Sequence, residues 1–248
     1  MGILLRAVQE HAHRSHAALE RGQRLLKAEK IIRLVETERP LEGARVLDIG
    51  TGAGVIAHTI AQKVGPEGEV QSLDVGDERV EKEGYSFQQV TSPRLPFEDK
   101  SFEIVLSNHV IEHVGDLPEQ RLHVAEIHRV LRDDGLLYLA TATRWLVMEP
   151  HYRLPFLSWF PRPVAGLYLR ATRKGEDYDC YLPSHRRLRQ TLADAGFRWT
   201  EPVFEAMRLM AEIEQPTGVT KAILTAPEPA LKVMRPVIPT IICLARKS

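Results

Sequence analysis

An aspartate and three closely spaced glycines are the first residues in this sequence whose types and spacing could bind a ligand. Asp48 stands within a short apolar run at residues 46–49, which is typical of a buried parallel strand. Glycines at every second position then permit a tight turn and let a ligand lie against the backbone. The residues of this loop are Gly50, Thr51, Gly52 and Gly54. Apolar residues at helical spacing follow from 55 to 64, so the N-terminal amides of a helix should point at the ligand.

The glycine spacing separates this loop from two common nucleotide-binding loops. A dinucleotide loop reads Gly-x-Gly-x-x-Gly, whereas this chain reads Gly-x-Gly-x-Gly with Val55 next, and the Gly-Lys-Ser/Thr of a Walker loop is absent. A carboxylate at Asp48 suits a positively charged ligand without phosphate. S-adenosylmethionine is such a ligand, because it carries a sulfonium and an ammonium group. A NAD-binding Rossmann oxidoreductase is the alternative, which Val55 and Asp48 disfavour.

Further polar residues fall at the expected ends of strands. A strand at 69–73 ends at Asp74, 20 residues beyond Gly54, where an acid hydrogen-bonds a ribose diol in nucleotide-binding sheets. In open α/β sheets the ligand lies at the carboxyl ends of the strands, so these ends should converge on one site. The cofactor-binding residues predicted there, besides the glycine loop, are Asp48, Asp74, Val75, Thr91, Ser92, Ser107 and Asn108.

Residues 48–54 resemble motif I of the class I S-adenosylmethionine-dependent methyltransferases. Leu-Pro-Phe at 95–97, Ser-Phe-Glu-Ile-Val-Leu-Ser at 101–107 and His-Val-Ile-Glu-His at 109–113 resemble the small-molecule branch of that family, which is methyltransferase type 11-like. The resemblance runs from about residue 40 to 143. It implies S-adenosyl-L-methionine as cofactor and a doubly wound, seven-stranded, mostly parallel α/β sheet. The family usually holds the adenine amino group with an acid after the third strand, where this chain has Thr91 and Ser92.

The resemblance implies transfer of a methyl group to an O, N or C nucleophile of a small organic acceptor. Proximity and alignment supply much of the catalysis, and a base is needed only when the nucleophile keeps its proton. His109, directly after the fourth strand, and His151 are the predicted catalytic residues, while His113 is interpreted as a packed helix residue. A non-catalytic protein that binds the adenosyl ligand is a further alternative.

The segment from residue 144 to 183 departs from the family pattern. It holds eight of the sixteen aromatic residues and five prolines, and it follows the fifth strand, above the predicted site. Long connections of this kind tend to be lids or binding loops. We expect a lid insertion that closes over an apolar or aromatic acceptor, including a lipid-like one, with the arginines of the segment on an acidic group or on a membrane surface. The competing expectation is a homodimer contact.

The domain prediction is a single methyltransferase domain over 1–248, with an N-terminal helical extension at 1–38, the lid insertion at 144–183 and a second insertion at 208–235. Helices are expected at 3–36, 55–64, 77–82, 117–131 and 188–195, with short ones at 209–213 and 230–234. Strands are expected at 46–49, 69–73, 85–90, 104–107, 136–141, 197–204 and 237–245.

The composition limits the other classes of function. Lys+Arg and Asp+Glu are both 33, so the net charge is zero, and no nucleic-acid partner is expected. The Asn-His after the fourth strand also differs from the Asn/Asp-Pro-Pro-Tyr motif of DNA amino-methylating enzymes. Cys180 and Cys243 are far apart in sequence, so no metal site is predicted, and His11, His13 and His16 are interpreted as a solvated helix end. No signal peptide or membrane span is visible, so a cytoplasmic location is expected.

Overall fold

The structure is a computed structural model that describes residues 21–149, 151–218, 227, 229 and 238–248. Residues 21–36 form a helix, which confirms the part of the predicted helix 3–36 that is described. The rest of that helix, the three histidines at 11, 13 and 16, and the predicted helix at 230–234 lie outside the described residues. The strand expected from 237 is described from residue 238 onward.

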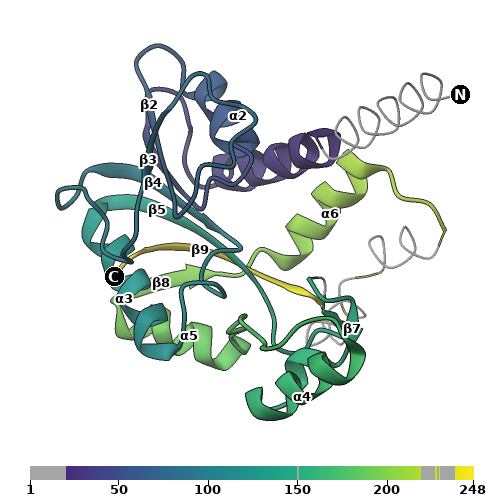
Figure 1. The fold of residues 1–248 in the computed structure, drawn as a ribbon. Coiled ribbons are helices and arrows are strands. Elements are labelled where there is room, and N and C mark those ends of the chain that lie inside the picture. Colours follow the sequence, from purple (N-terminus) through teal and green to yellow (C-terminus); the bar gives the residue numbers. More distant parts are fainter. Residues whose placement is uncertain (1–20, 150, 219–226, 228, 230–237) are drawn as a thin grey trace, which may run out of the picture.

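Seven strands form one sheet, as the sequence predicts (Figure 1). They are β1 (Arg45–Ile49), β2 (Glu69–Asp74), β3 (Ser86–Gln89), β4 (Phe102–Asn108), β5 (Leu131–Ala142), β8 (Phe197–Thr200) and β9 (Thr240–Lys247). Their order across the sheet is β3-β2-β1-β4-β5-β9-β8. The first five are parallel, and β9 is antiparallel to both of its neighbours. The chain reverses its strand order beside β1, so the crevice of this doubly wound sheet opens where β1 and β4 end.

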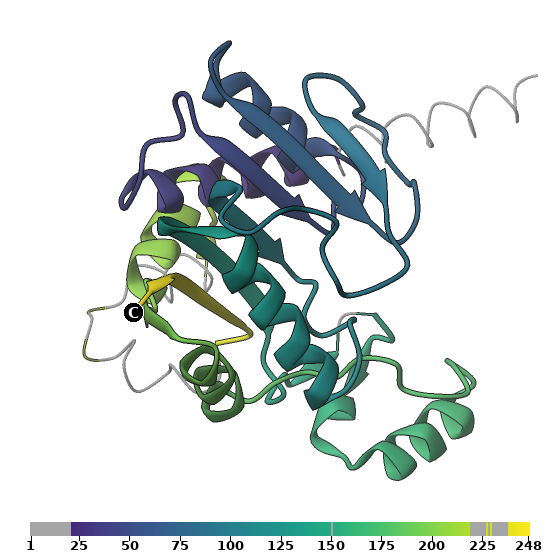
Figure 2. The ribbon, with the colours of Figure 1, turned by 90° about the vertical axis from the view of Figure 1, so that its left-hand side faces the viewer.

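Helices cover both faces of the sheet, because successive strand residues point to opposite sides. On one face, Leu47 and Val105 pack against α3 (Leu117–Val130) and α5 (His185–Asp194). On the other, Val46 and Ile104 pack against α2 (Val55–Val64), the helix at 21–36 and α6 (Val203–Glu214). Figures 1 and 2 show these two layers from perpendicular directions. Both strand faces are therefore buried, which explains the continuous apolar runs in β1 and β4.

Two elements differ from the sequence-based prediction near the C-terminal half. The strand expected at 197–204 ends at Thr200, because Pro202 precedes Val203, the first residue of α6. The short helix expected at 209–213 is the second half of α6. Arg33 and Lys30 of helix 21–36 form ion pairs with Glu212 and Glu214 of α6, so tertiary contacts extend this helix beyond its local signal.

The helix predicted at 77–82 is wrong. Asp77 accepts hydrogen bonds from the backbone N–H and the guanidinium of Arg79, at 2.9 to 3.2 Å, so the segment bends on itself. The N–H groups of Val80 and Glu81 both donate to the carbonyl oxygen of Ala53. These contacts take the backbone donors that a helix would use, and they hold residues 80–85 over the start of α2.

The described residues of segment 144–183, 144–149 and 151–183, form a separate unit beside the C-terminal ends of β4 and β5. It contains a two-stranded ribbon of β6 (Met148–Glu149) and β7 (Leu154–Pro155), a 3-10 turn η1 (Leu157–Trp159) and α4 (Arg162–Thr172). Leu157, Ala165 and Leu169 lie at the centre of its own small apolar core. The unit projects from one end of the sheet in both views (Figures 1 and 2).

Within the described ranges, no helix combines the length and the apolar character that crossing a bilayer requires.

Candidate cofactor and acceptor site

The glycine loop is held by backbone hydrogen bonds from β1 to the end of β2. The N–H groups of Gly50 and Thr51 donate to the carbonyl oxygen of Leu73 at 2.8 and 3.1 Å, and the Thr51 hydroxyl donates to the same oxygen at 3.0 Å. Gly50, Gly52 and Gly54 all have positive φ, at 80°, 51° and 81°. The loop therefore needs glycine for its backbone conformation, as the spacing predicted.

Two of these glycines also lie against neighbouring atoms. A Cβ on Gly50 would come within 2.3 Å of Val110 Cγ2, and one on Gly54 within 2.1 Å of the Glu81 carbonyl oxygen. A Cβ on Gly52 would meet nothing within 4 Å. Open space in front of Gly52, between two tightly packed glycines, is what a cradle for a ligand requires.

Asp74 joins the end of β2 to the glycine loop. Its Oδ2 accepts a hydrogen bond from Gly52 N–H at 2.8 Å, and its Oδ1 accepts one from Val75 N–H at 2.7 Å. Each carboxylate oxygen keeps a further lone pair, so the group can still accept from a ligand diol. The structure therefore brings Asp74 beside the loop where the sequence predicted it.

Asp48 lies beneath the loop as a buried carboxyl group. It is 2% exposed, and within the described part of the chain its Oδ2 has no hydrogen-bond partner. Burial raises the pKa of Asp48 to about 7, and the negative charge of Asp74 adds to the rise. A positive charge placed in the loop would relieve both effects, because it favours the ionised carboxylate. The site therefore has the electrostatic character of a cation-binding site.

The other predicted cofactor residues differ in how close they lie to the glycine loop. Val75 is 74% exposed at the rim of the loop. Thr91 and Ser92 are exposed just after β3, whose end is fixed to β2 because Val90 N–H donates to the Asp74 carbonyl oxygen. No contact in the described structure ties these two hydroxyls to the glycine loop, so their role at the adenine stays a prediction.

Ser107 and Asn108, at the end of β4, face different surroundings. The Ser107 hydroxyl lies 3.0 Å from Nε2 of His123 on α3, so it is engaged beneath the sheet. Burial lowers the pKa of that histidine to about 4, which keeps the ring neutral. Asn108 Oδ1 is buried and has no partner among the described residues, which leaves it available to a ligand.

His109 forms a hydrogen-bonded pair with a carboxylate that sequence reasoning missed. Its Nδ1 lies 2.9 Å from Glu112 Oε1, and its backbone is left-handed, with a φ of 59°. Glu112 is 1% exposed and also accepts from the Thr141 hydroxyl at 2.7 Å. Burial works to raise the pKa of Glu112, but the hydrogen bonds from His109 and Thr141 outweigh it and hold that pKa below its usual value. The His-x-x-Glu spacing directly after the fourth strand is the sequence feature that could have indicated this pair.

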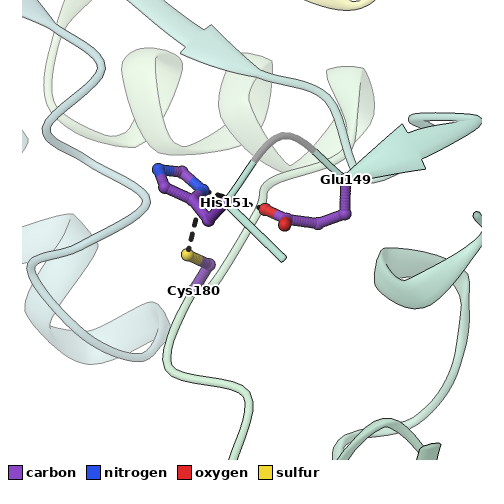
Figure 3. A group of neighbouring side chains, drawn as sticks. All are labelled: Glu149, His151 and Cys180. Atoms are coloured by element: carbon purple, nitrogen blue, oxygen red, sulfur yellow. Dashed lines mark hydrogen bonds and ion pairs between the residues drawn. The ribbon is translucent and has the colours of Figure 1, made fainter. Parts of the chain in front are cut away.

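His151, the second predicted base, belongs to a separate cluster (Figure 3). Its Nδ1 lies 2.9 Å from Oε1 of the buried Glu149 and 3.9 Å from the sulfur of Cys180. His113 Nδ1 lies 3.9 Å from the same sulfur, and its ring meets that of His151 edge-on, with centroids 5.3 Å apart. No local pattern in the sequence indicates this cluster, since Cys180 is 29 residues from His151.

Segment 144–183 is tied to the loop that follows β4. Tyr181 N–H donates to the Glu112 carbonyl oxygen at 2.8 Å. The side-chain amide of Gln120 bridges the carbonyl oxygens of Ile111 and Tyr181, at 3.1 and 2.7 Å. The segment that carries half of the aromatic residues is therefore fixed next to the His109–Glu112 pair.

Comparison with known proteins agrees with this fold. Residues 47–139 match the model of a methyltransferase-domain family. They span the glycine loop, Asp74, the His109–Glu112 pair and most of β5. Residues 47–139 thus form a methyltransferase domain with the fold of the class I S-adenosylmethionine-dependent methyltransferases, and S-adenosylmethionine is the cofactor of that family.

Curated relatives add a narrower comparison. The chain is 32% identical over 136 residues to a ubiquinone biosynthesis O-methyltransferase of Agrobacterium fabrum, and 30% identical over 136 residues to that of Rhizobium etli. The alignments cover 51% of this chain and 53% and 54% of those relatives, so the chain spans about half of their length. A solved S-adenosylmethionine-dependent methyltransferase of Mesorhizobium loti has the same fold. Its TM-score is 0.57 at 16% identity, and the match covers 87% of this chain and 96% of that one.

The residues present fit the cofactor of this family. The Asp48 oxygen that has no partner among the described residues and the negative charge of Asp74 suit a ligand with positive groups. The open space at Gly52 suits close approach to the backbone. We therefore propose that Asp48, the glycine loop and Asp74 are the residues that would hold it.

Proposed function

We propose that this protein transfers a methyl group from S-adenosylmethionine to a hydroxyl group of a small, apolar or aromatic acceptor. When bound, the cofactor supplies a methyl group on a sulfonium. An oxygen acceptor is favoured over nitrogen or carbon because the curated relatives are named O-methyltransferases. It is also favoured because a hydroxyl group keeps its proton at neutral pH, and the site holds a histidine that can accept it.

The observation that carries this proposal is the His109–Glu112 pair. Glu112, held as a carboxylate, accepts a hydrogen bond from Nδ1–H of His109, and this tautomer leaves the Nε2 lone pair for an acceptor hydroxyl. The buried negative charge stabilises the imidazolium that forms when His109 takes the proton, which is the role of the acid in a catalytic triad. The side chain of His109 is 32% exposed, so an acceptor can reach it.

Segment 144–183 supports the apolar character of the acceptor. Four aromatic side chains, which we call the aromatic patch, are 41% to 44% exposed beside the site: Trp145, Phe156, Trp159 and Phe160. Trp159 makes edge-to-face contacts with Trp145 and Phe156. A small polar acceptor would gain little from such a surface, whereas an apolar one would gain about 25 cal/mol for each Å² that it buries. We propose that this patch receives the acceptor, directly or from a membrane surface.

The test compares His109→Ala with the parent protein in release of labelled methyl to a panel of phenolic and aliphatic hydroxyl acceptors. Turnover should fall by about 10²- to 10⁴-fold, the usual contribution of a general base, while S-adenosylhomocysteine affinity stays within about twofold. Glu112→Gln should give a smaller loss. Unchanged turnover in His109→Ala would overturn the assigned base.

His128→Ala is the matched control, because this histidine packs on Phe197 away from the site and should leave turnover unchanged. The same preparation is titrated with S-adenosylhomocysteine and with NAD. Binding of NAD alone would replace the proposal with a dehydrogenase. Binding of the adenosyl ligand without turnover on the whole acceptor panel would favour a non-catalytic binding protein.

A further inference from the structure

Glu149, His151 and Cys180 bring three different metal-binding side chains together in segment 144–183 (Figure 3). One atom of each, a carboxylate oxygen, an imidazole nitrogen and the sulfur, lies within 4.8 Å of the other two. Glu149 lies in β6, His151 begins the connection to β7, and Cys180 lies near the end of the segment. Folding, and not sequence spacing, has therefore assembled the group.

Two of the three donor–donor distances in the group are close to those around a tetrahedral ion, and the third, between Glu149 and Cys180, is within 4.8 Å. With metal–sulfur bonds of about 2.3 Å and metal–nitrogen or metal–oxygen bonds of about 2.0 to 2.2 Å, neighbouring donor atoms stand about 3.3 to 3.6 Å apart. His151 Nδ1 lies 2.9 Å from Glu149 Oε1 and 3.9 Å from Cys180 Sγ. Shifts of a few tenths of an ångström would place both pairs at the required separations.

The surroundings of the group lack a compensating positive charge. Glu149 is 1% exposed, and in the described structure its ion-pair partner is His151 alone. The Cys180 side chain is buried, and its sulfur lies 3.6 Å from Oδ1 of Asp179. A divalent cation would supply positive charge at this place, and it would bind the sulfur as a thiolate.

The donor types indicate which ion would be held. One thiolate, one imidazole and one carboxylate suit Zn²⁺ better than Mg²⁺ or Ca²⁺, which prefer oxygen ligands. His113 Nδ1 also lies 3.9 Å from the Cys180 sulfur, on the loop that follows β4. We propose that Glu149, His151 and Cys180 form a zinc site that fastens the beginning of segment 144–183 to its end.

This proposal is independent of methyl transfer, so its test measures metal and not activity. The full chain is stripped with a chelator and dialysed, and Zn²⁺ is titrated in competition with a chromophoric chelator. One Zn²⁺ per chain is expected. His151→Ala and Cys180→Ser should each weaken binding at least about a hundredfold, because each removes a direct ligand. With Co²⁺ in place of Zn²⁺, the sulfur-to-metal absorption band should appear in the parent and vanish in Cys180→Ser.

Two controls separate this site from adventitious binding. Cys243→Ala removes the other cysteine, which lies buried in β9, and should keep the metal. A triple alanine variant at His11, His13 and His16 should also keep it. Loss of the metal from either control, or equal Zn²⁺ affinity in His151→Ala and the parent, would overturn the proposal.

A folding check uses His151→Ala, whose side chain is 50% exposed and can be removed without opening the core. S-adenosylhomocysteine titration of the same variant should match the parent. Failure of adenosyl binding with the metal retained would count against the proposed function only. Loss of the metal from a variant that still binds the adenosyl ligand would support the zinc site.

Discussion

The cofactor side of the site, residues 45–75, and segment 144–183 are built by different kinds of contact. In the first, backbone N–H groups of the glycine loop are fixed by the Leu73 carbonyl oxygen and by Asp74. In the second, side chains hold the fold: Trp159 Nε1 donates to the Leu146 carbonyl oxygen, and the Tyr152 hydroxyl donates to Asp179. A backbone cradle tolerates change in most side chains, whereas a side-chain assembly changes shape with each substitution. The comparison therefore predicts that substitutions in segment 144–183 change which acceptor is bound, whereas the identity of the cofactor stays the same.

The largest effect is expected from Gly52→Val. A branched side chain would fill the open space at this glycine and strain its positive φ, so S-adenosylhomocysteine affinity should fall at least about a hundredfold in calorimetric titration. Gly43→Val is the matched control, because Gly43 also has positive φ and open space but lies outside the site. It should lose about 1 to 2 kcal/mol of stability and keep its affinity. Equal losses of affinity in both variants would remove the loop from the cofactor site.

Asp74→Ala should have the next largest effect on the cofactor. Loss of charge-assisted hydrogen bonds to a ribose diol costs about 1.5 to 3 kcal/mol, which is about 10- to 100-fold in S-adenosylhomocysteine affinity. Asp77→Ala removes a nearby acid that pairs with Arg79 and should change the affinity less than threefold. If Asp74→Ala behaved in the same way, Asp74 would serve only to brace the loop.

The pH dependence of cofactor binding should report Asp48. Because its pKa in the folded protein is about 7, the cofactor-free protein keeps this proton between about pH 4 and pH 7 while the unfolded chain loses it. The unfolding free energy should therefore fall as pH rises through that window, and affinity for the positively charged cofactor should rise by about tenfold. Asp48→Asn should abolish both trends. A rise in affinity that persists in Asp48→Asn would assign the titration to another group.

The smallest effect is expected from changing Trp159 and Phe160 together to serine. The pair supplies only part of the aromatic patch, so the KM for an apolar acceptor should rise about three- to tenfold, with cofactor affinity and oligomeric mass unchanged. Leu26→Ser, an exposed apolar change on helix 21–36, is the control. A change of mass without a change of KM would make the patch a contact between two copies of the chain.

The fold of residues 45–75 was predictable from sequence because its signals are local. The apolar run at 46–49, the glycine spacing and Asp74 each act through neighbours in the same strand–loop–helix unit. The helix at 77–82 was predicted wrongly because the donors of Val80 and Glu81 bond to Ala53, a contact with no local signature. The contacts of Cys180 with Glu149 and His151, and of Glu112 with Thr141, also join residues far apart in sequence. They could not be predicted from local patterns either.

Strand β9 has a consequence for the order in which the chain folds during synthesis. It lies between β5 and β8, yet the ribosome makes it after both. Until residues 240–247 emerge, β5 has an open edge of unpaired backbone groups, a surface to which chaperones and other nascent chains can bind. Ribosome-bound chains halted before residue 240 should therefore be cut rapidly by protease within β5 and β8, and chains extended well past residue 247 should resist. Resistance in both would mean that the first five strands are stable without the C-terminal hairpin.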